Sequence, residues 1–134
     1  MLASGLPEIV ADNEDLARFL TSSGHFSTQA KMVKPPAFLP SVHHRETSVY
    51  RQGGEPVEAL WTLGDQHLPR FHGAAIIKAQ DVRVILLDVI ADEPPQRHAA
   101  IVGWPWLDED PIEQKALQKE RALQIASKAA LLLR

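Results

Sequence analysis

The stretch FHGAAIIKAQDVRVILLDVIADEPPQRHAAIVG, residues 71–103, decides the fold that we predict. Apolar and β-branched residues fill three runs within it, 71–78, 81–90 and 98–103, and such runs are typical of strands. The first two runs are close enough for a tight connection, and the Pro-rich segment 92–96 predicts a turn before the third. We therefore expect an antiparallel meander whose middle strand, 81–90, is covered on both faces.

A long helix is expected after this meander, from about Pro111 to near Leu133. Asp110 is placed to cap its first turn, and proline is tolerated at the first helical position. Apolar residues then recur at helical spacing, at Ile112, Ala116, Leu123, Ala126, Ala130 and Leu133. Its final segment, 129–133, is apolar on nearly all sides, so it either lies in the core or contacts a partner or second copy.

Shorter elements are predicted before residue 71. Acidic residues at the start of 12–20 and an apolar face behind them predict a short helix. A second short helix is expected over 56–64, with Pro56 at its first position and Gly64 as its stop. The segments 31–34 and 47–50 predict two further strands.

These elements predict a single α+β domain over residues 1–134. We expect an antiparallel sheet of three to five strands, with the long C-terminal helix on one face and two short helices around it. A chain of 134 residues buries enough surface to fold without a disulfide or a structural metal.

Composition excludes several kinds of chemistry. The chain has no cysteine, so disulfide scaffolds, thiolate zinc sites, iron–sulfur clusters and cysteine nucleophiles are ruled out. Metalloprotease, EF-hand, phosphate-loop and G-x-S-x-G motifs are also absent from the sequence. We therefore predict no metal site and no cofactor.

Charge and hydropathy bear on partners and compartment. The net charge of −3 disfavours a nucleic-acid partner, although a local basic stripe would still allow one. No apolar run is long enough to span a membrane, and residues 1–5 lack the features of a signal peptide. We expect a cytoplasmic protein with no membrane contact.

Two polar clusters are candidates for catalysis. In the first, residues 43–51, alternation along a strand would place Arg45 and Arg51 on one face and His44 on the other. In the second, Arg97 and His98 follow the acidic turn at 92–96. A histidine beside an arginine can transfer a proton while the arginine stabilises phosphoryl or oxyanion charge, as a metal-independent nuclease requires. The alternatives are a solvated loop for the first cluster and a satisfied turn for the second, in which Asp92 or Glu93 pairs with the histidine.

Four residues are candidates for binding. Trp104 and Trp106 form a rigid aromatic corner that can grip a ligand or partner, or can close one end of the core. His72 begins one outer strand of the expected meander and His98 begins the other, which would place them about two strand spacings apart. Arg51 completes the set as a cation at the end of its strand.

Three segments carry a resemblance: 46–51 (ETSVYR), 60–64 (LWTLG) and 92–105 (DEPPQRHAAIVGWP). Together they resemble a group of short bacterial proteins of unknown function, over residues from about 31 to 132. The resemblance implies a bacterial cytosolic protein that acts with a larger partner, and implies no particular activity.

The function that we expect is a non-catalytic interaction or accessory module, which binds a protein partner or self-associates through the apolar end of the C-terminal helix and the corner formed by Trp104 and Trp106. The alternative is a small metal-independent nuclease-type hydrolase, with His98 or His44 as acid or base and Arg45, Arg51 or Arg97 as electrostatic clamp. The acidic net charge and the incomplete catalytic set favour the first expectation.

Overall fold

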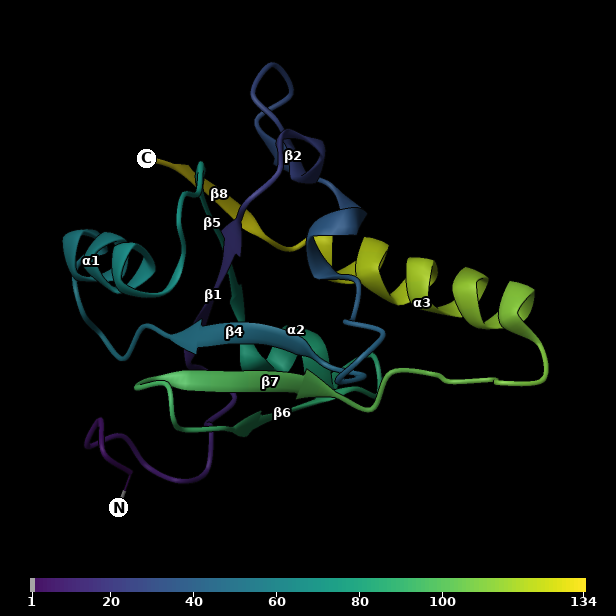
Figure 1. Cartoon of the computed structure of the whole chain (residues 1–134), viewed down its shortest axis with the longest axis horizontal. Helices are drawn as coiled ribbons and strands as arrows, with labels where there is room; N and C mark the ends of the chain where they lie inside the picture. Colours follow the sequence, from purple (N-terminus) through teal and green to yellow (C-terminus); the bar gives the residue numbers. More distant parts are fainter. Residues whose placement is uncertain (1) are drawn as a thin grey trace.

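The structure is a computed structural model that describes residues 2–134. An antiparallel sheet of six strands runs through it in the order β6-β7-β4-β1-β5-β8 (Figure 1). Its strands are β1 (Asp15–Leu20), β4 (Thr47–Arg51), β5 (Gly73–Lys78), β6 (Asp88–Ala91), β7 (His98–Val102) and β8 (Ala130–Leu133). A separate two-stranded sheet pairs β2 (Phe26–Ser27) with β3 (Met32–Val33). The α+β class is confirmed, and the main sheet has more strands than the three to five expected.

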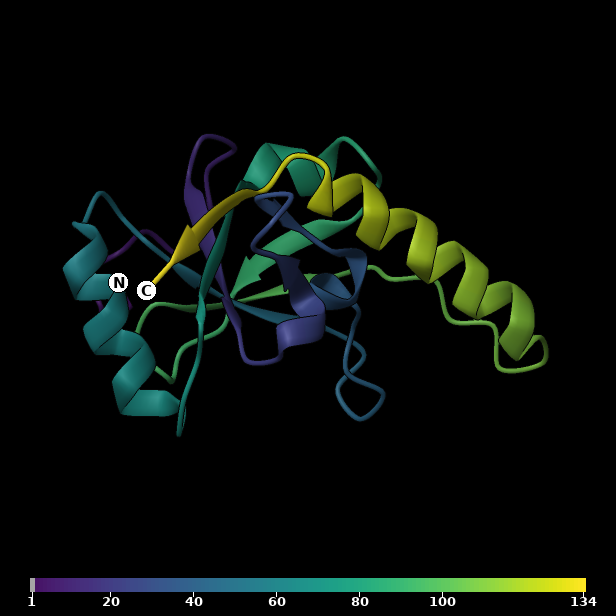
Figure 2. The same cartoon turned by 90° about the horizontal axis from the view of Figure 1, so that it is seen from above.

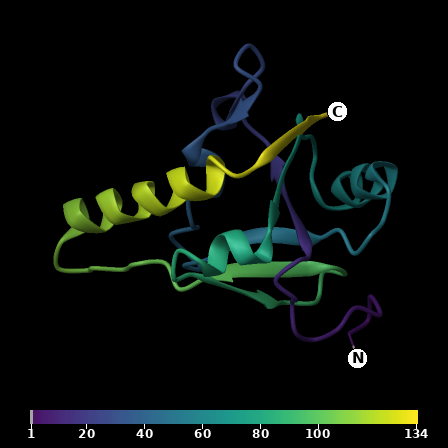
Figure 3. The same cartoon turned by 180° about the vertical axis from the view of Figure 1, so that it is seen from behind.

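Helices cover both faces of this sheet. The α-helices are α1 (Val57–His67), α2 (Ala79–Arg83) and α3 (Pro111–Ala126), and the 3-10 helices are η1 (Ser23–His25) and η2 (Pro35–Phe38). On one face, Leu60 of α1 packs on Ala17 and Phe19 of β1. On the other face, residues of α2, η2 and the C-terminal half of α3 build the larger core. The N-terminal half of α3 projects away from the sheet (Figures 1 and 3), and Ile112 there is 85% exposed.

The predicted meander is wrong at its middle strand. Residues 79–83 form α2 instead, and only Asp88–Ala91 of the predicted run is a strand. Asp81 accepts a hydrogen bond from the Lys78 amide at 3.0 Å, which caps a helix where the sequence suggested a turn between strands. As a result β5 pairs with β1 and β8, and three strands separate it from β6.

The helix predicted over 12–20 is also wrong, because this segment contains the central strand β1. Leu16 and Leu20 belong to the core on one face, while Ala17 and Phe19 belong to the core on the other. Burial on both faces favours a central strand over an amphipathic helix with one solvated side.

The other early elements are confirmed, with one change of length. Met32–Val33 and Thr47–Arg51 are strands as predicted, and α1 covers the second predicted helix. Gly64 does not stop α1, which continues to His67. A Cβ at residue 64 would lie 2.5 Å from the Phe71 ring, so the glycine allows close packing of the helix rather than ending it.

The C-terminal helix is shorter than predicted. It ends at Ala126, and Ala130–Leu133 form the edge strand β8 beside β5 (Figure 2). Gly73 permits this pairing, because a Cβ there would lie 2.1 Å from the Leu132 carbonyl oxygen. Within residues 2–134, no helix is both long enough and apolar enough to cross a bilayer.

Candidate functional site

A hydrogen-bonded row of polar side chains lies on one face of β4 and β7. Strand alternation turns Thr47, Val49 and Arg51 into the larger core, and leaves Ser48 and Tyr50 on the opposite face. Tyr50 pairs across the sheet with His98, so His98 points to the same face. Ser48 is exposed there, whereas His98 is buried.

His98 links two parts of the chain that are far apart in sequence. Its Nδ1 lies 2.9 Å from the Asp92 carbonyl oxygen and 3.3 Å from Asp92 Oδ2. Its Nε2 lies 3.0 Å from Ser48 Oγ. Of the two carboxylates that the sequence offered to this histidine, Asp92 is therefore the partner, since Glu93 binds Ser4 instead. The three side chains form a chain of contacts from a carboxylate through an imidazole to a hydroxyl.

The ring of Tyr50 joins this row from the side. It meets His98 edge-on, with ring centroids 5.3 Å apart, and stacks on His67 of α1 at 5.7 Å. Burial raises the pKa of Tyr50 above its ordinary value of 10.0, so its hydroxyl keeps its proton near neutral pH.

Arg51 and Arg97, the two arginines expected to assist His98, form hydrogen bonds with other partners. Arg51 is fully buried, and its Nε and Nη2 each donate to Glu14 at 2.8 Å. Arg97 donates from Nε to the Arg51 carbonyl at 2.9 Å and from Nη2 to the Gln52 carbonyl. The predicted electrostatic clamp of arginines beside His98 is therefore not formed. Arg51 belongs to a buried ion pair with Glu14 and is not a binding residue. The physical reason is strand alternation, which turns Arg51 away from the face that carries His98.

The ion pair between Arg51 and Glu14 also lowers the pKa of the Glu14 carboxyl. Burial raises the pKa of the Glu14 carboxyl, but hydrogen bonds from Arg51 and the Ala11 amide, with the charges of Arg51 and Arg83, outweigh it. The net result is a pKa below the ordinary 4.5.

His44 and Arg45 lie in an exposed turn before β4, not on the strand. The Arg45 guanidinium carbon stands 4.8 Å above the ring of Trp106, and its Nη2 lies 3.4 Å from Asp108 Oδ1. The structure does not bring either residue into the row around His98, and the solvated-loop alternative describes His44.

Trp104 and Trp106 pack in and against the larger core. Trp104 is 4% exposed, which matches the core-closing interpretation of the corner rather than a gripping surface. Neither indole N–H has a hydrogen-bond partner among residues 2–134. The ring of His72 lies tilted against that of Phe26, with ring centroids 5.4 Å apart. It does not approach His98, since β1 and β4 stand between β5 and β7 and separate the strands by about 14 Å.

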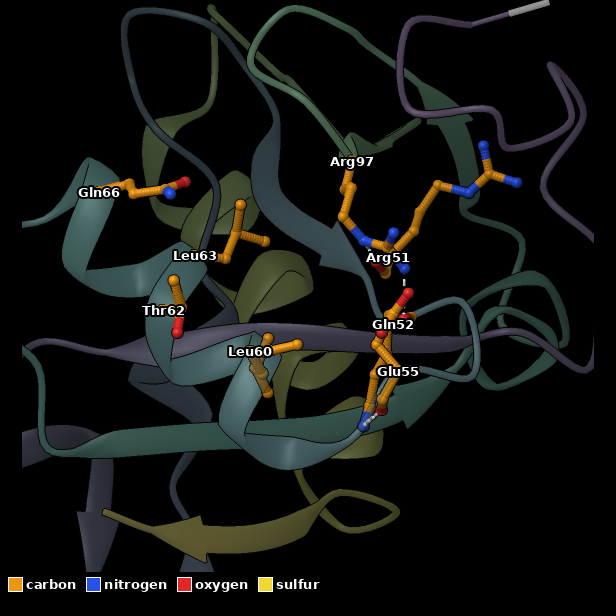
Figure 4. Close-up of a pocket in the computed structure, with 9 residues that line it drawn as sticks. Arg51, Gln52, Glu55, Leu60, Thr62, Leu63, Gln66 and Arg97 are labelled. Carbon is orange, nitrogen blue, oxygen red and sulfur yellow. Dashed lines mark hydrogen bonds between the residues drawn. The ribbon is translucent and has the colours of Figure 1, made fainter.

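A pocket of about 390 Å³ lies between α1 and the end of β4 (Figure 4). One wall is α1 and the other is the segment that follows β4, with Arg97 above it. The lining residues are Arg51, Gln52, Glu55, Ala59, Leu60, Thr62, Leu63, Gln66 and Arg97. Nothing in the sequence indicated this pocket, because its walls meet only when α1 folds over the sheet.

The two edges of the main sheet differ in how their backbone groups are satisfied. On β6, Val89 faces outward, and its N–H donates to Asp88 Oδ1 at 2.7 Å while its carbonyl accepts from Arg83 Nη2 at 3.2 Å. On β8, the bond from the Arg134 N–H to the His72 carbonyl, at 2.9 Å, shows which residues face β5. By alternation Leu131 and Leu133 face outward, and neither has a backbone partner on that side among the described residues.

Comparison of the chain with protein-family models, curated proteins and solved structures finds no match. Over residues 2–134, no group of three or more His, Asp or Glu side chains is arranged to hold a metal ion.

Proposed function

We propose that this chain is an interaction module that associates with a second copy of itself through the outer edge of β8. The observation that carries the proposal is the unsatisfied backbone of Leu131 and Leu133 on an apolar strand. Unpaired N–H and C=O groups in a row are a template for another strand, and strand addition supplies both hydrogen bonds and apolar contact.

The comparison with β6 supports this choice of edge. Natural sheets protect their edges with charged side chains, prolines, bulges or covering segments. The β6 edge has such protection, because Asp88 and Arg83 occupy the outward groups of Val89. The β8 sequence, Ala-Leu-Leu-Leu, contains neither charge nor proline, and Leu133 is 45% exposed.

A second copy fits this edge because antiparallel pairing about a twofold axis is self-complementary. With Leu131 of one copy opposite Leu133 of the other, each outward N–H meets an outward carbonyl.

Sedimentation equilibrium of the full chain tests the proposal. We expect a particle of twice the 14.9 kDa chain mass, and conversion to monomer by Leu133→Lys, because each ammonium group would then replace the apolar neighbour of Leu131 in the other copy and would lie diagonally across the axis from the second ammonium group. Leu131→Pro provides a second variant, since it removes an outward N–H that β5 does not use. Ile90→Lys on β6 is the matched control, as Ile90 is 48% exposed on the protected edge. A monomeric wild-type chain, or a dimer that survives both β8 variants, would show that β8 does not mediate self-association.

The nuclease-type alternative gains no support from the arginines. Arg51 and Arg97 are bonded to Glu14 and to backbone carbonyls, and Arg45 stands over Trp106. A phosphodiester at His98 would therefore lack the cationic clamp that this chemistry requires.

A further inference from the structure

We propose that Ser48 is a nucleophile activated by His98 and Asp92, and that the outer face of β4 and β7 is a catalytic site for small uncharged carboxylic esters. This activity is separate from the proposed self-association, because β4 and β7 are not edge strands and β8 lies at the far edge of the sheet.

The hydrogen bonds determine which ring nitrogen of neutral His98 carries the proton. Both oxygens near Nδ1 belong to Asp92, one a backbone carbonyl and the other a carboxylate, and such oxygens only accept. Nδ1 must therefore donate. The lone pair then lies on Nε2, which faces Ser48 Oγ at 3.0 Å, so the serine hydroxyl donates to it. This is the tautomer that a general base needs.

Burial and exposure are distributed as a nucleophilic site requires. The His98 side chain is 9% exposed and held on its Nδ1 side, so the ring is fixed in place. Ser48 is exposed, so its hydroxyl is within reach of a molecule in solution. If His98 served only to hold the turn between β6 and β7, its contacts with Asp92 would be sufficient. The hydrogen bond to the exposed Ser48 contributes little to the stability of that turn.

The chemical step follows from these contacts. Ser48 Oγ attacks the ester carbonyl carbon, and its proton moves to His98 Nε2. The carbon–oxygen bond to the leaving alcohol then breaks, and His98 returns the proton to that oxygen. Water hydrolyses the Ser48 ester by the same route, so the products are a carboxylic acid and an alcohol, with the enzyme regenerated.

The charges of the surroundings limit the substrate class. The nearby cations are Arg18, Arg51 and Arg97. Arg18 and Arg97 donate to backbone carbonyls and Arg51 pairs with Glu14, so an anionic substrate finds no counterion in this row. Tyr50 lies on the same face of β4 as Ser48, and its ring meets that of His98 edge-on at 5.3 Å. We assign it as the donor that stabilises the oxyanion of the tetrahedral intermediate. An uncharged ester needs that single donor and no clamp.

Two measurements on the full chain test the site. The first is labelling by an alkyl fluorophosphonate, in which Ser48 Oγ displaces fluoride from phosphorus, with the modified residue located by peptide mass spectrometry. The second is the hydrolysis of p-nitrophenyl acetate. We expect the label on Ser48, and a loss of hydrolysis of at least about 100-fold in Ser48→Ala.

The controls separate catalysis from folding. Ser127→Ala removes another exposed hydroxyl, one that donates to the Gln124 carbonyl at 2.8 Å, and should change neither readout. Asp92→Asn and Tyr50→Phe should each slow hydrolysis. Ser48→Ala should unfold at the same urea midpoint as the wild-type chain. A label on lysine or histidine but not on Ser48, or unchanged hydrolysis in Ser48→Ala, would overturn the proposal. So would a drop in the urea midpoint of Ser48→Ala without labelling of the wild type, because Ser48 would then be structural.

Discussion

Replacing Glu14 by glutamine should strongly destabilise this protein, because it leaves the guanidinium of Arg51 buried without its anion. Arg51 is 0% exposed, and both of its bonds to Glu14 are 2.8 Å long. Its Nη1 also donates to the Pro7 carbonyl at 2.6 Å, which joins the N-terminal segment to β4. Glu14→Gln keeps the size and one oxygen to accept from the Ala11 amide, but it removes the charge and places an amide donor opposite one of the two donating groups of Arg51.

The magnitude follows from burial. Removing one partner of a buried ion pair costs about 3–5 kcal/mol, since the remaining charge is uncompensated. Glu14 is 17% exposed, so water reaches part of the site and we expect the lower end, about 3 kcal/mol. For a domain of this size the corresponding fall in Tm is on the order of 10 °C.

Urea denaturation followed by circular dichroism measures this cost directly. The double variant Glu14→Gln with Arg51→Met provides the control, because it removes the unpaired cation and should recover part of the loss. A loss below about 1 kcal/mol in Glu14→Gln, or a double variant whose loss equals the sum of the single losses, would refute the assignment of a coupled buried pair.

Two further predictions concern acid and the β8 edge. Side-chain hydrogen bonding by Arg83 holds the pKa of Asp88 below its ordinary 3.8, and the pKa of Glu14 is also depressed. Both groups stabilise the fold above their unfolded pKa values and lose this effect as pH falls through the folded ones. Unfolding free energy should therefore decline below about pH 4.5, with a shallower decline in Glu14→Gln. Gly73→Ala should displace β8 at a cost of about 1–3 kcal/mol and expose its amides to hydrogen exchange, because the new Cβ would lie 2.9 Å from Leu133 Cα. Amides of β8 that stay protected in Gly73→Ala would contradict this.

Local signals were sufficient for several elements. Asp110 accepts from the Glu113 amide at 3.0 Å, and Pro111 follows it, so the start of α3 was readable from two adjacent residues. The strands β4 and β7 were readable from their β-branched and apolar runs. The contact of His98 with Asp92 was also within reach, since only a short turn separates them.

The remaining assignments depended on long-range packing. Acidic residues before Leu16 suggested a helix cap, but burial on both faces made that segment the central strand. The apolar end of the chain continued a helical pattern, yet Gly73 offered an edge on which backbone hydrogen bonds and burial favoured a strand.

By itself, then, the amino-acid sequence determined the class of the fold, the absence of cysteine chemistry and the positions of the strongest local elements. Only the tertiary structure decided the strand order, the partner of Arg51 and the meeting of Ser48 with His98, which lie 50 residues apart. The physical reason is that helix capping and hydrophobic periodicity are patterns within a few residues. Strand pairing joins residues that are far apart in the chain, and no local sequence pattern indicates which strands will pair.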